Sequence, residues 1–192
     1  MTKNVYGIGL MIYGATMLAF FAMYFFGMNT DYFNNSLLVN AFVLPAVYLA
    51  GAYYSVYSIK KQGIQMNFKD VFGRAFKPMF FGGLLSVLSM FLFLNFIDKD
   101  AKDLLNFQYV ERQKTELKNE YEKAKIGMVD KAQIEELERN YELRQKSFSP
   151  ELLKDQDKFS FRWFTYYFGA IMVFYVILSV FFASFFRSIT PV

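Results

Sequence analysis

The chain has 192 residues, of which 55% are hydrophobic and 21% aromatic, and it contains no cysteine and no histidine. These absences exclude a disulfide framework, a thiol nucleophile, a cysteine–histidine zinc site and any catalytic pair that uses histidine. The net charge is +4, but the charged residues are distributed as in a membrane protein, and we expect no nucleic-acid partner.

Four stretches contain no charged residue: 5–28, 37–57, 79–97 and 163–186. Each is long enough to cross a hydrocarbon core of roughly 30 Å as a helix that rises about 1.5 Å per residue. A spanning backbone must satisfy its own hydrogen bonds, so these stretches should be α-helical. The predicted fold is therefore all-α, a polytopic membrane protein with four transmembrane helices. The first stretch exceeds the apolar core of a signal peptide, and we expect it to be an uncleaved anchor.

The region 58–78, between the second and third stretches, predicts an amphipathic helix in a cytoplasmic loop. Asn67 can cap this helix, with Asp70 in its first turn, and its apolar residues share one face that would lie along the inner leaflet. The cations of the loop either only set the membrane topology or contact anionic lipid. The candidate lipid contacts are Lys60, Lys61, Lys69, Arg74 and Lys77.

The segment 98–162 holds 29 of the 38 charged residues. A disordered charged loop is one interpretation, but apolar residues recur at helical spacing on both sides of residue 127. Gly127 can end the first helix, and Asp130 with Gln133 resembles a capping box that opens a second. The segment therefore predicts an antiparallel helical hairpin, similar to a short coiled coil.

In a hairpin that turns at Val129, Tyr121 pairs with Leu137 and Leu117 with Tyr141. The complete predicted seam is Val110, Leu117, Tyr121, Ala124, Ile134, Leu137, Tyr141 and Phe148. The seam is too narrow to bury much surface by itself, so the hairpin should pack on the membrane domain, on another copy or on a partner. A short helix at 151–154 and an aromatic belt would then lead into the fourth span.

Orientation follows from the cations near the spans. Lys3, Arg187 and the five loop cations would share one side with a single acid, Asp70, whereas the short loop on the other side contains Asp31 and no cation. Both termini should therefore be cytoplasmic in a bacterial inner membrane, with 98–162 extracytoplasmic. The predicted organisation is 1–97 for three spans, 98–162 for the hairpin, and 163–192 for the fourth span and tail.

Polar side chains are rare inside the spans. No ionisable Asp, Glu, Lys, Arg or His lies there, which disfavours ion-coupled transport and voltage sensing. Asn40, Ser86, Ser89 and Asn95 remain, and they leave open a polar path in a small oligomeric transport or lipid-handling protein. Pro45 should kink the second helix or free one carbonyl for a neighbour.

Signatures of catalysis are missing. The chain has no Walker A sequence, no G-x-S-x-G sequence, no dinucleotide fingerprint and no acid pair within a span. We therefore expect no enzyme activity, no cofactor and no metal. An enzyme of envelope glycan or lipid chemistry that uses Asp98 and Asp100 is a third hypothesis, although acids at these positions are also typical of a helix N-terminus.

A resemblance to a family rests on the segment 68–98, FKDVFGRAFKPMFFGGLLSVLSMFLFLNFID. Together with the charged insert, the Phe148-Ser149-Pro150 step and the last span, it resembles bacterial membrane proteins grouped as domain of unknown function family 4199. The most specific parts are F-x-x-x-F before the third span and NFID after it, where Lys99 stands at a position that is often proline in the family. The resemblance implies four spans with a charged helical insert, supplies no activity, and suggests partners in polyprenyl-linked glycosyl transfer.

These observations favour a non-enzymatic accessory or scaffold protein of the inner membrane. Its projecting hairpin would dock a protein partner or another copy, and its spans would contact membrane lipids. The alternatives are the oligomeric transport or lipid-handling protein and an accessory to polyprenyl-linked glycosyl transfer.

Overall fold

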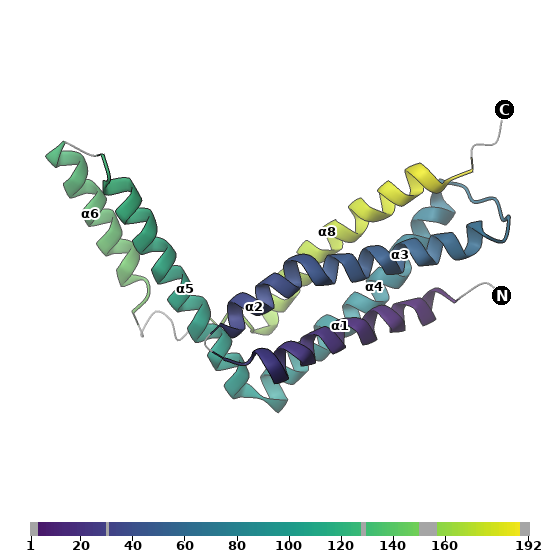
Figure 1. Cartoon of the computed structure of the whole chain (residues 1–192), viewed down its shortest axis with the longest axis horizontal. Coiled ribbons are helices and arrows are strands. Elements are labelled where there is room, and N and C mark those ends of the chain that lie inside the picture. Colours follow the sequence, from purple (N-terminus) through teal and green to yellow (C-terminus); the bar gives the residue numbers. More distant parts are fainter. Residues whose placement is uncertain (1–3, 30, 128–129, 150–156, 189–192) are drawn as a thin grey trace.

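The computed structural model describes residues 4–29, 31–127, 130–149 and 157–188, and every regular element within these ranges is helical. Figure 1 shows a bundle of long helices from which a second group of helices projects at an angle. In chain order the elements are α1 (Val5–Gly27), α2 (Tyr32–Leu38), the π-helical segment η1 (Val39–Val43), α3 (Leu44–Lys60), α4 (Phe68–Leu92), the π-helical segment η2 (Phe93–Ile97), α5 (Lys99–Lys125), α6 (Lys131–Lys146) and α8 (Phe161–Phe186).

Four helical stretches are long and apolar enough to cross a membrane: Val5–Gly27, Tyr32–Lys60, Phe68–Ile97 and Phe161–Phe186. The second consists of α2, η1 and α3, and the third of α4 and η2. The prediction of an all-α protein with four candidate spans is therefore confirmed. Pro45 lies in the first turn of α3, directly after the π-helical segment η1.

The region 58–78 differs from the prediction of a loop with its own surface helix. α3 continues to Lys60 and α4 already begins at Phe68, so only residues 61–67 connect the two helices. Asn67 does cap α4, as predicted, and the structure shows that it forms a capping box with Asp70. The separate surface helix is wrong because Val71, Ala75 and Met79 are buried on the same face as the small residues that follow them, so one continuous helix buries more apolar surface.

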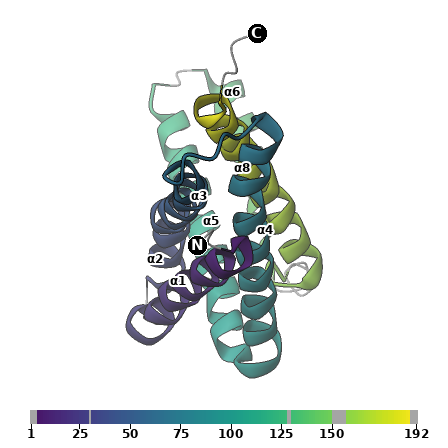
Figure 2. The ribbon, with the colours of Figure 1, turned by 90° about the vertical axis from the view of Figure 1, so that its right-hand side faces the viewer.

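α4 packs against each of the other candidate spans, α1, α3 and α8, and the end-on view in Figure 2 shows it beside α8 and α1. Close approach to α1 depends on glycine, because a Cβ added at Gly82 would lie 2.6 Å from the carbonyl oxygen of Gly9. An added Cβ at Gly83 would likewise collide with the hydroxyl of Tyr175. Small residues that let backbones approach are typical of helix pairs in membranes.

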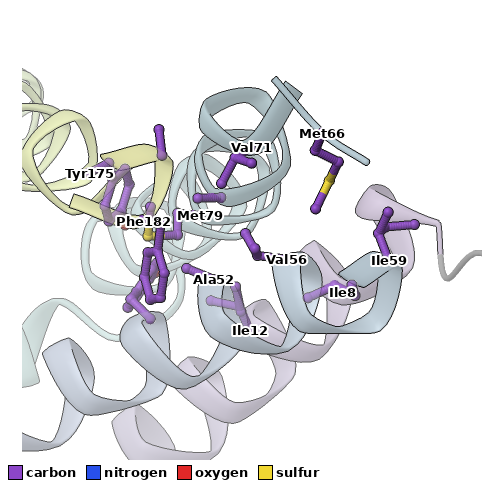
Figure 3. Close-up of a cluster of buried hydrophobic side chains, with 13 residues drawn as sticks. Ile8, Ile12, Ala52, Val56, Ile59, Met66, Val71, Met79, Tyr175 and Phe182 are labelled. Carbon is purple, nitrogen blue, oxygen red and sulfur yellow. The ribbon is translucent and has the colours of Figure 1, made fainter. Parts of the chain in front are cut away.

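The main core joins all four candidate spans (Figure 3). Ile8 and Ile12 of α1 meet Ala52 and Val56 of α3 in this core. The remaining buried members are Tyr48, Ile59, Met66, Val71, Ala75, Met79, Tyr175, Phe182 and Ala183. The connection before α4 closes this end of the bundle, because the carbonyl of Met66 accepts a hydrogen bond of 2.8 Å from the amide of Ser188.

A second, smaller core lies at the opposite end of the bundle, where α5 begins. Tyr32 of α2, Leu94 of η2, and Ala101 and Leu105 of α5 are buried together. The first turns of α5 therefore belong to the packed bundle, whereas its later turns and α6 project from it (Figure 1). We call α5 and α6 together the α5/α6 arm.

Candidate functional site at the base of the arm

Asp98 connects the start of α5 to α1. Its Oδ1 accepts a hydrogen bond of 3.0 Å from the amide of Ala101, which caps α5, and its Oδ2 accepts one of 2.6 Å from the hydroxyl of Tyr24. The bond from Tyr24, followed by the one from the Ala101 amide, lowers the pKa of the Asp98 carboxyl below its ordinary value. Asp98, one of the two hypothetical catalytic acids, is thus engaged in holding α5 against α1.

Asp157 connects α5 to the start of α8. Its carboxylate accepts hydrogen bonds from Lys102 Nζ at 3.1 Å, Asn106 Nδ2 at 2.9 Å and the amide of Phe159 at 2.9 Å. Partial burial raises the pKa of Asp157, but these hydrogen bonds outweigh burial and leave the pKa below its ordinary value. The carboxylate is therefore satisfied on several sides by groups from α5 and from the chain just before α8.

Two amide side chains complete the base of the arm. Asn95 Nδ2 donates to the carbonyl of Phe159 at 3.0 Å, so η2 is joined to the chain before α8. Gln108 accepts a hydrogen bond of 2.7 Å from the amide of Phe33 and donates one of 2.7 Å to the carbonyl of Asn29. Hydrogen bonds of this kind contribute about 1 kcal/mol each, and together they fix α5 relative to three separate parts of the bundle.

An open groove of about 630 Å³ lies beside this junction, between α5 and residues near the start of α2. Its lining includes Leu104 and Phe107, and Phe107 is 62% exposed. Arg112 crosses the groove and donates to Asn34 at 3.2 Å and to Glu116 at 2.7 Å. The lining of the groove therefore combines apolar side chains with side chains of both charges.

Within the arm, the contacts between α5 and α6 run in antiparallel order. Tyr121 stacks on Tyr141 with ring centroids 4.4 Å apart. Lys125, at the C-terminal end of α5, forms an ion pair of 2.9 Å with Glu138. Arg144, near the C-terminal end of α6, pairs with Glu120 at 3.0 Å. Hydrogen bonds from Lys125 and from the Tyr121 hydroxyl lower the pKa of Glu138, and those of Lys125 to Glu138 and Tyr121 raise its own pKa.

The predicted seam residues are arranged differently from the register that turns at Val129, a residue outside the described part of the chain. Tyr121 stacks on Tyr141, whereas the prediction paired it with Leu137. Leu117 is buried and Ala124 is exposed. The other seam residues, Val110, Ile134, Leu137, Tyr141 and Phe148, are half-buried. Side-chain direction contributes to this shift, because helical side chains lean toward the N-terminus of their own helix and those of α5 and α6 therefore lean in opposite directions.

Lys114 pairs with Glu111 of its own helix at 2.8 Å. No described residue of α6 is buried, and Leu143 on its outer side is 57% exposed. The arm thus presents a complete helix face beyond the bundle. The predicted short helix at 151–154 lies outside the described residues.

The five candidate lipid-contacting cations lie around the connection between α3 and α4, at the end of the bundle away from the arm (Figure 1). Lys60 is the last residue of α3, and its Nζ lies 4.9 Å from the ring centroid of Phe186. Lys61, Lys69 and Lys77 are exposed, whereas Arg74 is half-buried on α4. They belong to the end of α3, the connection after it and the first turns of α4.

The polar residues of the spans do not gather along one path. Asn40 is exposed on η1, and Ser86 donates to the carbonyl of Gly82 in its own helix at 2.8 Å. Ser89 bonds Tyr13 at 3.1 Å, and Asn95 belongs to the base of the arm. Within the described ranges, no three acidic side chains come together as a metal site would require.

The sequence did not point to Tyr24, Asn106, Gln108 or Asp157, which hold the arm in place. Tyr24 lies in an apolar span, and the others lie in a segment so rich in polar residues that no single one stands out. A polar residue near the end of a span, opposite an acid that follows another span, is the only signal that could have suggested the bond between Tyr24 and Asp98.

No curated protein and no solved structure matches the chain. A family model does match, over residues 8–188, and it covers the four candidate spans and the α5/α6 arm almost completely. The chain therefore belongs to the family described as "Protein of unknown function (DUF4199)", as its resemblance in the segment 68–98 implied.

Proposed function

We propose that the protein is a non-enzymatic membrane scaffold whose α5/α6 arm binds a protein partner. The observation that carries the proposal is the contrast between the two helices of the arm. The base of α5 is fixed by Asp98, Asp157 and Gln108, whereas no described residue of α6 is buried. α6 itself gains little stability from burial, but it packs on α5, whose base is fixed. Its outer face is therefore suited to binding a partner.

Membrane orientation is part of the proposal. The cations around the α3–α4 connection favour the cytoplasmic side for that end of the bundle. The arm lies at the opposite end (Figure 1) and would therefore stand outside a bacterial inner membrane. The partner would be an envelope protein or the extracytoplasmic part of another membrane protein, with a second copy of this chain as the simplest case.

Contacts within the arm leave the outer side of α6 available. Tyr141, Glu138 and Arg144 all face α5, whereas Leu143 is exposed. Glu136 lies seven residues before Leu143, two helical turns away on the same face. We expect the partner to bind this face, with Leu143 as an apolar contact.

Site-specific cross-linking tests the proposal, since the chain has no cysteine and a single introduced thiol is unambiguous. A photoreactive group attached to Leu143→Cys or Glu136→Cys in intact cells should give the same protein adduct, identified by mass spectrometry. Ile177→Cys, on the exposed apolar face of α8, serves as the control and should not give that adduct. The adduct should also disappear when Leu143→Asp is combined with Glu136→Cys.

Two outcomes would overturn the proposal. One is the absence of a protein adduct from both α6 positions under conditions in which the reagent labels them. The other is an equal adduct from Ile177→Cys, which would indicate contact through the membrane spans. A reporter fused at Gly127 checks the orientation separately, because activity on the cytoplasmic side would contradict an external arm.

A further inference from the structure

A second surface, separate from the outer face of α6, lies where α8 begins. Lys158 Nζ is 4.0 Å from the centroid of the Trp163 ring, and Arg162 Nε donates to the hydroxyl of Tyr166 at 3.2 Å. The rings of Trp163 and Tyr166 meet edge to face with centroids 5.8 Å apart. These four residues form one continuous cluster of two cations on two aromatic rings, which we call the headgroup cluster.

The cations of the headgroup cluster are not neutralised within the described part of the chain. Neither Lys158 nor Arg162 has a carboxylate within ion-pair distance there, whereas Lys102, Arg112 and Lys125 each have one. Asp157 is adjacent in sequence, but its oxygens accept from Lys102, Asn106 and the Phe159 amide. Among the described residues the two positive charges therefore have no acidic partner, and they can receive an anion from outside.

The position of the cluster identifies the kind of anion. α8 is a candidate membrane span that begins at Phe161, and Phe161 and Tyr166 are 70% and 53% exposed. Tyrosine and tryptophan are enriched at the level of lipid headgroups, where their rings are apolar on one side and wet on the other. Cations held on such rings lie at the depth of lipid phosphates.

Toward the bilayer centre, the same face of α8 is smooth. Gly169 and Ala170 follow Tyr166 by three and four residues, and an added Cβ at Gly169 would meet nothing within 4 Å. Val173 and Ile177 continue this face and are 60% and 61% exposed. A straight acyl chain can therefore lie along α8 directly below the two cations.

We propose that the headgroup cluster binds an anionic phospholipid in the leaflet on the arm side, with its phosphate on Lys158 and Arg162 and one acyl chain along Gly169 and Ala170. Phosphate oxygens would accept hydrogen bonds from both cations. The bound lipid would support the junction from which the arm projects, since Lys158 also donates its amide to Asn106 of α5 at 3.0 Å.

Trp163 is the only tryptophan in the chain and serves as the probe. The full-length protein is reconstituted in phosphatidylcholine vesicles with increasing fractions of phosphatidylglycerol that carries a nitroxide high on its acyl chain. Trp163 fluorescence should be quenched more strongly by this lipid than by phosphatidylcholine with the same label. In Lys158→Gln/Arg162→Gln the preference should fall about fivefold per removed charge.

Matched variants separate this site from general electrostatics and from misfolding. Lys131→Gln/Arg139→Gln removes two cations from α6 and should leave the preference unchanged. Lys158→Arg/Arg162→Lys keeps both charges and should largely restore it. Equal preference in the wild type and Lys158→Gln/Arg162→Gln, or an equal loss in the α6 control, would overturn the proposal. Relief of quenching by inorganic phosphate, but not by chloride of equal ionic strength, would assign the cluster to free phosphate and overturn the lipid assignment.

Discussion

Ser55 on α3 donates its hydroxyl proton to the main-chain carbonyl of Arg74 on α4, at a distance of 2.6 Å. In a regular α-helix this carbonyl would accept from the amide four residues later, but that residue is Pro78, which has no amide proton. Ser55 and Pro78 are both fully buried. The neighbouring helix therefore supplies the hydrogen bond that proline removes, a compensation that membrane helices require because lipid offers no donor.

This relationship makes Ser55→Ala a sensitive variant. Loss of the hydroxyl leaves the Arg74 carbonyl without the donor on α3, and we expect the free energy of unfolding to fall by about 1 kcal/mol. Pro78→Ala restores an amide proton, so Ser55→Ala should cost less in a Pro78→Ala background. Unfolding in mixed micelles of mild detergent and SDS measures the cycle. Strict additivity of the two substitutions would contradict the account.

Close packing of α1 on α4 gives a second prediction. Gly82→Ala places a Cβ 2.6 Å from the carbonyl of Gly9, so the two helices must move apart. We expect a loss of about 1–3 kcal/mol in the free energy of unfolding, the usual range for overpacking. Gly7→Ala is the matched control on α1, because an added Cβ there meets nothing within 4 Å. Equal effects of the two substitutions in the same micelle assay would argue against this helix contact.

The base of the arm should respond to acid. The pKa of Asp98 is lowered in the folded protein by the Tyr24 hydroxyl, so the bond stabilises the fold at pH values above the ordinary pKa of an aspartate. Its contribution is lost as the pH falls through the lowered pKa, where the carboxylate becomes protonated. Tyr24→Phe should therefore lower the thermal midpoint at pH 7, and its difference from the wild type should shrink toward pH 3.

Thermal scans of both proteins in the same detergent, from pH 7 to pH 3, measure this dependence. Tyr13→Phe is a useful control because its hydroxyl bonds Ser89, a group without charge in this range. Its effect should be independent of pH. A Tyr24→Phe effect of constant size across the range would show that the charge of Asp98 is not involved.

Local signals in the sequence were sufficient for the helices and most of their ends. Charge-free stretches predicted four spans, Asn67 and Asp70 predicted the cap of α4, and Gly127 follows the end of α5 with a φ of 93°. Asp130 also caps α6, through its hydrogen bond from Ala132 at 3.0 Å. These features depend on residues close in sequence, so their physical causes are visible without the fold.

Features that depend on distant residues were not predictable in the same way. Lys69, Arg74 and Lys77 suggested a surface helix at 58–78, although the buried face of α4 runs through the region without interruption. The register of the arm depends on how side chains lean, which spacing alone does not reveal. The bond between Tyr24 and Asp98 joins residues 74 apart, and it required the packing of α1 against η2 and α5 to be known.

The stacked pair Tyr121 and Tyr141 gives the last prediction. Tyr141→Ala removes a stacked aromatic contact that contributes about 1 kcal/mol beyond its buried area, and no described residue of α6 is buried to compensate for the loss. Hydrogen exchange of α6 amides should therefore accelerate, while exchange in α1 and α4 stays unchanged because the base of the arm is held by Asp98 and Asp157.

The control for this experiment is Leu143→Ala, since Leu143 is 57% exposed and faces away from α5. Its α6 amides should exchange as in the wild type, within the small effect of a helix-favouring substitution. Faster exchange in both variants would mean that α6 is stabilised along its whole surface, which requires a partner already bound to the outer face. Unchanged exchange in Tyr141→Ala would instead show that the ion pairs of Lys125 and Arg144 hold α6 against α5 without the stacked rings.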